Sequence, residues 1–120
     1  MKTKPWFILL ALVVLGASLR YWGLWWGLPE RVDFHPDENY YVIRHAMQVS
    51  LAHPDPIFLN YPSFLCYTVA LLRGALQVVV GWGQEQWQVY LIGRAVSALY
   101  GTLTVLAAFL LARRLGAKPI

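Results

Sequence analysis

The chain has 120 residues, of which 58% are apolar, 15% aromatic and only 13% charged, with a formal net charge of +4. Soluble domains average about 45–50% apolar and about 25% charged residues, so this composition excludes a disordered chain and a nucleic-acid-binding module, and the single cysteine excludes a disulfide scaffold. A mean hydropathy of +0.48 favours the class that remains, the membrane proteins. At about 20 residues per spanning helix, the chain has room for only a few spans.

The first uncharged stretch predicts a transmembrane helix over about 6–26. Arg20 interrupts it about two turns before the end, where a long side chain can snorkel to the interface. The aromatic residues within 21–26 form an interfacial belt at the same end. A cleavable signal peptide is the alternative, because a basic start precedes an apolar core and small residues at 16–18. Continuation of the apolar segment into the tryptophan-rich belt favours a retained helix.

Residues 27–88 are predicted to form a polar outer loop, with a first helix near 36–51. Asp37 and Glu38 would stand at the positive end of that helix, which favours the ionised form of Asp37. Steps of three and four residues place one set of polar side chains on a shared face: Asp37, Tyr41, Arg44 and Gln48. An ionised Asp37 has the property that a general base needs. The alternative is that the acidic pair only caps an amphipathic surface helix.

A third apolar stretch, residues 57–82, is long enough to span, but it contains a proline, an arginine and two glycines. The charge distribution argues against a third span. Both tails are basic, whereas residues 30–88 carry three arginines against six acidic residues, a net charge of −3. Basic segments stay in the cytoplasm, so two cytoplasmic tails require an even number of spans. Residues 61–81 are therefore predicted to form a helix lying in the outer interface.

The last uncharged run, residues 95–112, predicts a second transmembrane helix over about 90–112. The expected fold is all-α: a polytopic helical membrane protein in which two transmembrane helices flank an outer loop with juxtamembrane helices. We expect a multi-pass protein of the cell (inner) membrane, with both tails in the cytoplasm and the loop outside.

Two further groups of residues could carry chemistry. Histidines and carboxylates gather between residues 35 and 53, but no spacing matches the helical two-histidine metal pattern. A metal site is left open, because Asp37 or Glu38 could still meet a divalent ion with ligands from elsewhere. Three arginines near the outer interface are suited to bidentate contact with a lipid phosphate: Arg20, Arg73 and Arg94. Ordinary snorkelling to phospholipid headgroups is the alternative.

Four segments also carry a family resemblance. They are residues 19–24 (LRYWGL), residues 35–38 (HPDE) followed by two tyrosines, residues 60–65 (NYPSFL), and residues 94–105 (RAVSALYGTLTV). Their order and spacing resemble the N-terminal module of GT-C glycosyltransferases. The branch they are most similar to holds dolichyl-phosphate-mannose–protein mannosyltransferases and bacterial aminoarabinose (lipid A) transferases. Ser63 stands where that family has a second proline.

The resemblance implies a membrane glycosyltransferase that moves a sugar from a polyprenyl-phosphate-linked donor to a protein, lipid or glycan acceptor on the non-cytoplasmic face. Asp37 matches the catalytic residue that activates the acceptor, and Glu38 is its companion in the acidic pair. Arg94, which opens the second helix, is expected to contact the carrier phosphate. The other expected substrate-binding residues are Tyr41, Arg44 and Tyr61. The lipid-linked sugar is the donor substrate, and no other cofactor is implied.

Two other classes of function remain open at this point. A small membrane protein with this layout could be a non-catalytic subunit whose outer loop binds a partner. It could also be a transport or lipid-headgroup-binding component that uses its arginines. Members of the GT-C family are several times longer. If the chain is a transferase, we therefore expect these 120 residues to be the N-terminal portion of an enzyme and to be inactive alone.

Overall fold

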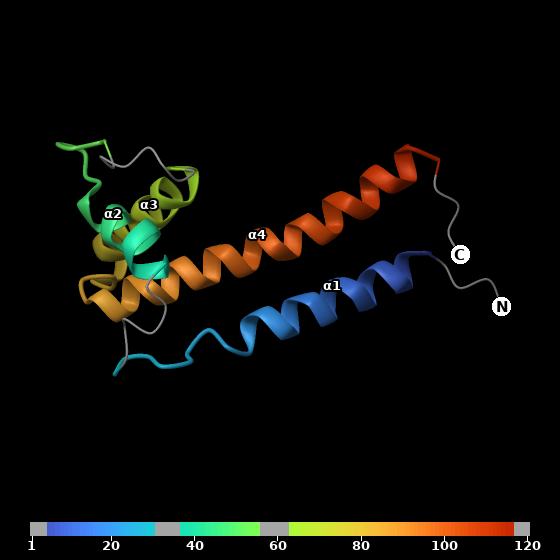
Figure 1. Ribbon diagram of the computed structural model, residues 1–120, viewed down its shortest axis with the longest axis horizontal. Coiled ribbons are helices and arrows are strands. Elements are labelled where there is room, and N and C mark those ends of the chain that lie inside the picture. The colour runs from blue at the N-terminus through green and yellow to red at the C-terminus, as the bar shows by residue number, and fades with distance from the viewer. Residues whose placement is uncertain (1–4, 31–36, 56–62, 117–120) are drawn as a thin grey trace. The chain divides into compact units, whose positions relative to one another are not determined.

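The computed structural model describes residues 5–30, 37–55 and 63–116, and every regular element within these ranges is a helix (Figure 1). The elements are α1 (Pro5–Tyr21), a π-helix η1 (Glu38–Ile43), α2 (Arg44–Gln48), α3 (Ser63–Val80) and α4 (Gln86–Arg114). The expected all-helical class is confirmed. The chain divides into two compact units, Met1–Gly23 with Ala98–Ile120 and Leu24–Ser97, and α4 contributes residues to both.

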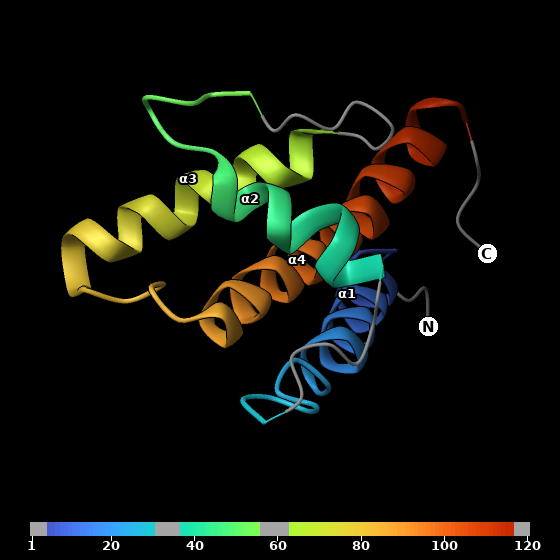
Figure 2. The ribbon, with the colours of Figure 1, turned by 60° about the vertical axis from the view of Figure 1, so that its left-hand side comes forward.

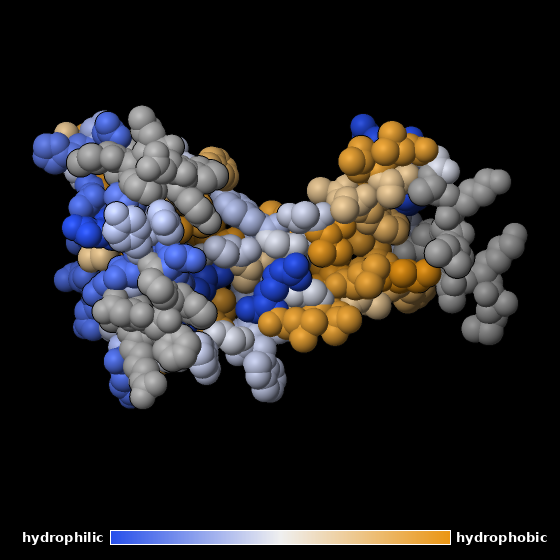
Figure 3. Space-filling view, in the orientation of Figure 1, coloured by the Kyte–Doolittle hydropathy of each residue, from blue (hydrophilic) through white to orange (hydrophobic). Residues whose placement is uncertain are grey.

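The first unit pairs α1 with the second half of α4 in antiparallel directions. Near the start of α1, the Trp6 ring lies 5.9 Å from the ring of Phe109. Near its end, Arg20 lies against Gly101. Most of the large apolar side chains of this pair face outward, as the orange surface over α1 and the end of α4 in Figure 3 shows. A helix pair with an apolar exterior fits a lipid surround rather than water.

Helix α1 ends earlier than the sequence predicts. The helix expected over 6–26 stops at Tyr21, and residues 22–30 form a series of turns. Gly27 adopts a positive φ of 80°, a conformation that costs little only for glycine. Pro29 follows two residues later and cannot donate a helical hydrogen bond. The tryptophans of the expected belt therefore lie on turns rather than on a helix.

The second unit has a small apolar core built from four elements (Figure 2). Ile43 of η1 and Val69 of α3 are fully buried, and both lie near Gly93 of α4. A Cβ atom at Gly93 would come within 2.9 Å of Ile43 Cδ1, so the absence of a side chain there lets η1 approach α4 closely. This packing holds the end of η1 against α4, and the acidic pair lies at the opposite end, where η1 begins.

The predicted helix over 36–51 is interrupted by a change of helix type. Residues Glu38–Ile43 form a π-helix, and α2 continues only to Gln48, after which Val49 is extended. The π-helix bonds each N–H five residues back, so side chains four apart no longer share a face as they do in an α-helix. Val42 and Ile43 of this π-helix are both buried. The single polar face expected for Asp37, Tyr41, Arg44 and Gln48 rested on α-helical spacing throughout. That spacing is present between Arg44 and Gln48 in α2 but not across the π-helix.

Helix α4 begins four residues before the expected 90–112 segment. Its start is fixed by Gln88, whose Oε1 accepts the backbone N–H groups of Gly83, Gln84 and Glu85 at 2.7, 3.0 and 3.2 Å. A glutamine three residues into a helix that reaches back to the cap is one half of a capping box. The turn between α3 and α4 uses Gly81 and Gly83, both at positive φ.

Two helices, α3 and α4, are long and apolar enough to cross a membrane. Only 11% of the most apolar window of each is buried, unlike the core helix of a soluble domain, and length and composition thus indicate membrane insertion. Helix α1 has 17 residues and is shorter than this criterion. The expected second span, 90–112, lies within α4, whereas the segment expected to lie flat, 61–81, contains α3, whose 18 residues are also long enough to cross a membrane.

Candidate functional site

The acidic pair lies where the chain enters η1. Asp37 has helical backbone angles, is exposed, and makes no side-chain hydrogen bond that caps η1. Glu38, the next residue, opens the π-helix and is only partly exposed. The Asp37 side chain therefore does not cap η1 through a hydrogen bond. Within residues 5–30, 37–55 and 63–116, no side chain or backbone group bonds the Asp37 carboxylate.

Glu38 is bound by Arg94 of α4 in a two-pronged ion pair. Arg94 Nε donates to Glu38 Oε1 at 2.8 Å, and Nη2 donates to Oε2 at 3.1 Å. This fork-to-fork geometry is the strong form of an arginine–carboxylate contact. The Arg94 and Glu38 side chains are only 13% and 20% exposed, so water screens the pair weakly.

The remaining terminal nitrogen of Arg94 binds the chain that follows α1. Nη1 donates to the carbonyl oxygens of Leu24 and Trp26, at 3.0 and 2.7 Å. One guanidinium thus joins three segments: the 24–26 turn, η1 and α4. We call this set, Arg94 with Glu38 and the carbonyls of Leu24 and Trp26, the Arg94 clasp. These bonds use four of the five N–H donors of the guanidinium, so a two-pronged contact with a phosphate would require displacing Glu38 or a carbonyl.

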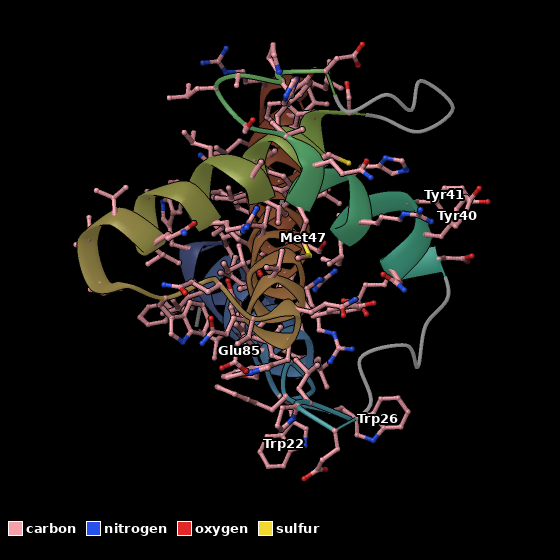
Figure 4. All side chains as sticks on the ribbon, turned by 90° about the vertical axis from the view of Figure 1, so that its left-hand side faces the viewer. Trp22, Trp26, Tyr40, Tyr41, Met47 and Glu85 are labelled. Atoms are coloured by element: carbon pink, nitrogen blue, oxygen red, sulfur yellow. The ribbon has the colours of Figure 1, made fainter. Side chains whose placement is uncertain are left out.

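Two of the expected substrate-binding residues near the acidic pair, Tyr41 and Arg44, have different surroundings. The Tyr41 ring packs edge-on against Tyr40, with centroids 5.1 Å apart, and both project together from η1 (Figure 4). The Tyr41 carbonyl accepts a hydrogen bond from Cys66 Sγ at 3.5 Å, which ties η1 to α3. Arg44 opens α2 with an exposed side chain. Tyr61, the remaining expected site residue, lies outside the described residues.

No protein-family model, curated protein or solved structure matches the chain. The case for any function therefore depends on its own residues and contacts.

A second arginine, Arg73, also bonds backbone groups of other segments. Arg73 of α3 donates from Nε to the Gly83 carbonyl at 3.1 Å and from Nη1 to the Met47 carbonyl at 3.2 Å. It therefore ties α3 to the end of α2 and to the turn before α4. Of the three arginines singled out from the sequence, two thus bond carbonyl groups of distant segments. Sequence position alone identified them as unusual charges but did not show their partners.

An aromatic cluster beside the clasp was not predicted as a unit. The Trp87 ring lies 6.1 Å from Trp25 and 6.0 Å from Trp82, and its indole N–H donates to the Glu85 carboxylate. Trp25 is far in sequence from Trp82 and Trp87, so no local sequence pattern could have grouped all three. Within the described ranges, no group of three or more histidine, cysteine or acidic residues is placed to hold a metal ion.

Proposed function

We propose that the chain is the N-terminal part of a GT-C-like membrane glycosyltransferase and that Asp37 is the general base that activates the acceptor. The observation that carries this proposal is the division of the acidic pair. Glu38 is held by Arg94, whereas the neighbouring Asp37 carboxylate is exposed and has no partner among the described residues. A general base must be free to take a proton from a substrate group, and only Asp37 of the two meets that condition.

The chemistry would be a single displacement at the anomeric carbon of a polyprenyl-phosphate sugar. Asp37 would accept the proton of the acceptor hydroxyl or amine as its oxygen or nitrogen forms the new bond to carbon. The lipid phosphate would leave with the electrons of the broken glycosyl–oxygen bond. Glu38 would not react; as a positioning residue, it would hold the start of η1 against α4 through the Arg94 clasp.

The test of this proposal is a transfer assay on membranes that carry the complete product of the gene. Membranes are supplied with a radiolabelled polyprenyl-phosphate sugar, and label in protein, lipid and glycan fractions is counted separately. We expect label to move from the carrier into one of these fractions, and not in membranes from a strain lacking the gene. Equal transfer in both strains, over a panel of donor sugars, would overturn the proposal.

The proposal includes a topology in which the loop with the acidic pair lies outside and both tails lie in the cytoplasm. Single cysteines placed at Asp55 and at Lys118, in a Cys66→Ala background, test it. We expect an impermeant thiol reagent to label the cysteine at position 55 in intact cells and the cysteine at position 118 only after lysis. Asp55 is exposed, so access to the reagent is not limited by packing. Labelling at position 118 in intact cells would instead indicate three spans.

A further inference from the structure

Arg20 is a charge of the α1–α4 helix pair that has no acidic neighbour there. The two segments that form this unit, Met1–Gly23 and Ala98–Ile120, contain no aspartate or glutamate. Within the part of the chain that the structure describes, the ion pair of an arginine is that of Arg94 with Glu38, in the other unit. Ionisable side chains within membrane segments usually pair with one another, so the Arg20 charge calls for a partner from outside its unit.

Snorkelling to the outer interface would direct the Arg20 side chain beyond the end of α1, but the side chain runs the other way. Its Nη1 donates to the carbonyl oxygen of Gly16, one turn earlier, at 2.9 Å. A Cβ atom at Gly101 of α4 would lie 2.5 Å from Arg20 Nε and 3.1 Å from Cδ. The missing side chain of Gly101 thus leaves the space in which the guanidinium is seated. Packing against α4 therefore holds the charge back from the headgroups.

The position of Gly101 in α4 gives the depth of this charge. Helix α4 runs from Gln86 to Arg114, and its uncharged part lies between Arg94 and Arg113. At the rise of an α-helix, Gly101 lies about 10 Å from the level of Arg94 and about 18 Å from that of Arg113. The hydrocarbon layer of a bilayer is about 30 Å thick. With α4 across the membrane, the Arg20 guanidinium would lie inside that layer and not at the level of the lipid phosphates.

The Arg20 side chain is nevertheless exposed on the surface of the helix pair. A guanidinium carries five N–H donors, and among the described residues Arg20 bonds through one of them, to Gly16. Charged side chains at membrane depth are costly in contact with lipid tails, and they face the interior of a helix bundle or a water-filled cavity instead. The face of the pair that carries Arg20 is therefore suited to contact with protein.

We propose that a membrane-spanning helix from outside these 120 residues covers this face and presents an aspartate or glutamate to Arg20. A carboxylate accepts two parallel bonds from a guanidinium, and Arg20 has the free donors for them. A second copy of the chain does not offer that group within the membrane, because none of its long helices, α1, α3 and α4, contains an acidic residue. The inference is independent of sugar transfer, since it concerns assembly and not reaction.

The test measures the binding of synthetic membrane-spanning peptides to the purified full chain in phosphatidylcholine vesicles. The peptides are leucine–alanine helices of about 20 residues whose central residue is aspartate, asparagine or leucine. Energy transfer between a fluorescent label on the amino terminus of the chain and one on the peptide reports binding. We expect the aspartate peptide to bind about tenfold more tightly than the leucine peptide. The asparagine peptide should fall between them, because its amide accepts a hydrogen bond but carries no charge.

Arg20→Gln should abolish the preference for the aspartate peptide, whereas Arg20→Lys, which keeps the charge but not the fork, should retain part of it. The second variant also covers the case in which Arg20→Gln does not fold. Arg114→Gln is the matched control, because Arg114 is an exposed arginine of the same unit, and it should leave the preference unchanged.

Three results would overturn the proposal. The first is equal binding of the aspartate and leucine peptides to the original chain, and the second is an unchanged preference in Arg20→Gln. The third is self-association of the chain that needs Arg20 but no peptide, which would assign the face to a second copy. None of these results affects the transfer assay, so the two proposals can fail separately.

Discussion

Replacing Arg94 with glutamine should lower the free energy of unfolding by about 2–4 kcal/mol. The change removes the charged partner of Glu38 and the donor to the carbonyls of Leu24 and Trp26. Because the two side chains are only 13% and 20% exposed, water can replace the lost bonds only in part. The cost should therefore exceed the value of a surface ion pair, which is about 0–1 kcal/mol.

A double-mutant cycle isolates the ion pair from the rest of the clasp. Glu38→Gln, Arg94→Gln and the double variant are unfolded by denaturant in mixed micelles, and tryptophan fluorescence reports the transition. Since the two side chains bond each other, we expect the double variant to lose clearly less stability than the sum of the single losses. Arg114→Gln, at the exposed end of the same helix, should change stability by no more than about 0.5 kcal/mol. Additive losses at Glu38 and Arg94 would contradict a coupled pair.

The helices were predictable from the sequence, whereas several of their ends were not. Uncharged runs indicate helices in the regions of α1, α3 and α4, because burial of backbone polar groups in lipid demands helical bonding. The end of α1 at Tyr21 depends on turn formation over residues 22–30, and the same residues also fit a continued interfacial helix. The π-helix could not be predicted from the sequence for a different reason. The buried positions Val42, Ile43 and Ala46 fit an α-helix as well as a π-helix, and only packing against α4 decides between the two.

For the candidate site too, the sequence indicates individual residues but not the contacts between residues that are far apart in the chain. The acidic pair at residues 37 and 38 and the arginine at 94 stand out in the sequence because charges are rare in this chain. The bond between Glu38 and Arg94 joins residues 56 positions apart, and no spacing rule connects them. The carbonyls of Leu24 and Trp26 carry no side-chain signal at all. Their contribution to the clasp could be found only from how the chain after α1 meets α4.

If the transferase proposal holds, Asp37→Asn in the complete gene product should reduce sugar transfer by about a hundredfold or more, the usual range for loss of a general base. The amide is nearly the same size as the carboxylate but cannot accept the acceptor's proton. Because Asp37 is exposed and has no bonding partner among the described residues, the substitution should leave membrane insertion and stability close to those of the original protein. Loss of turnover without loss of folded protein is the expected result.

The comparison of Asp37→Asn with Glu38→Gln separates a catalytic residue from a positioning one. Glu38→Gln should lower stability and turnover together, since it weakens the Arg94 clasp that holds η1, and a stabilising lipid should restore part of the turnover. Asp37→Asn should not be rescued in that way, because its defect is chemical. Asp55→Asn, an exposed aspartate of the same loop, should retain transfer and serves as the matched control. Normal turnover in Asp37→Asn would remove Asp37 from the mechanism, whatever the effect of Glu38→Gln.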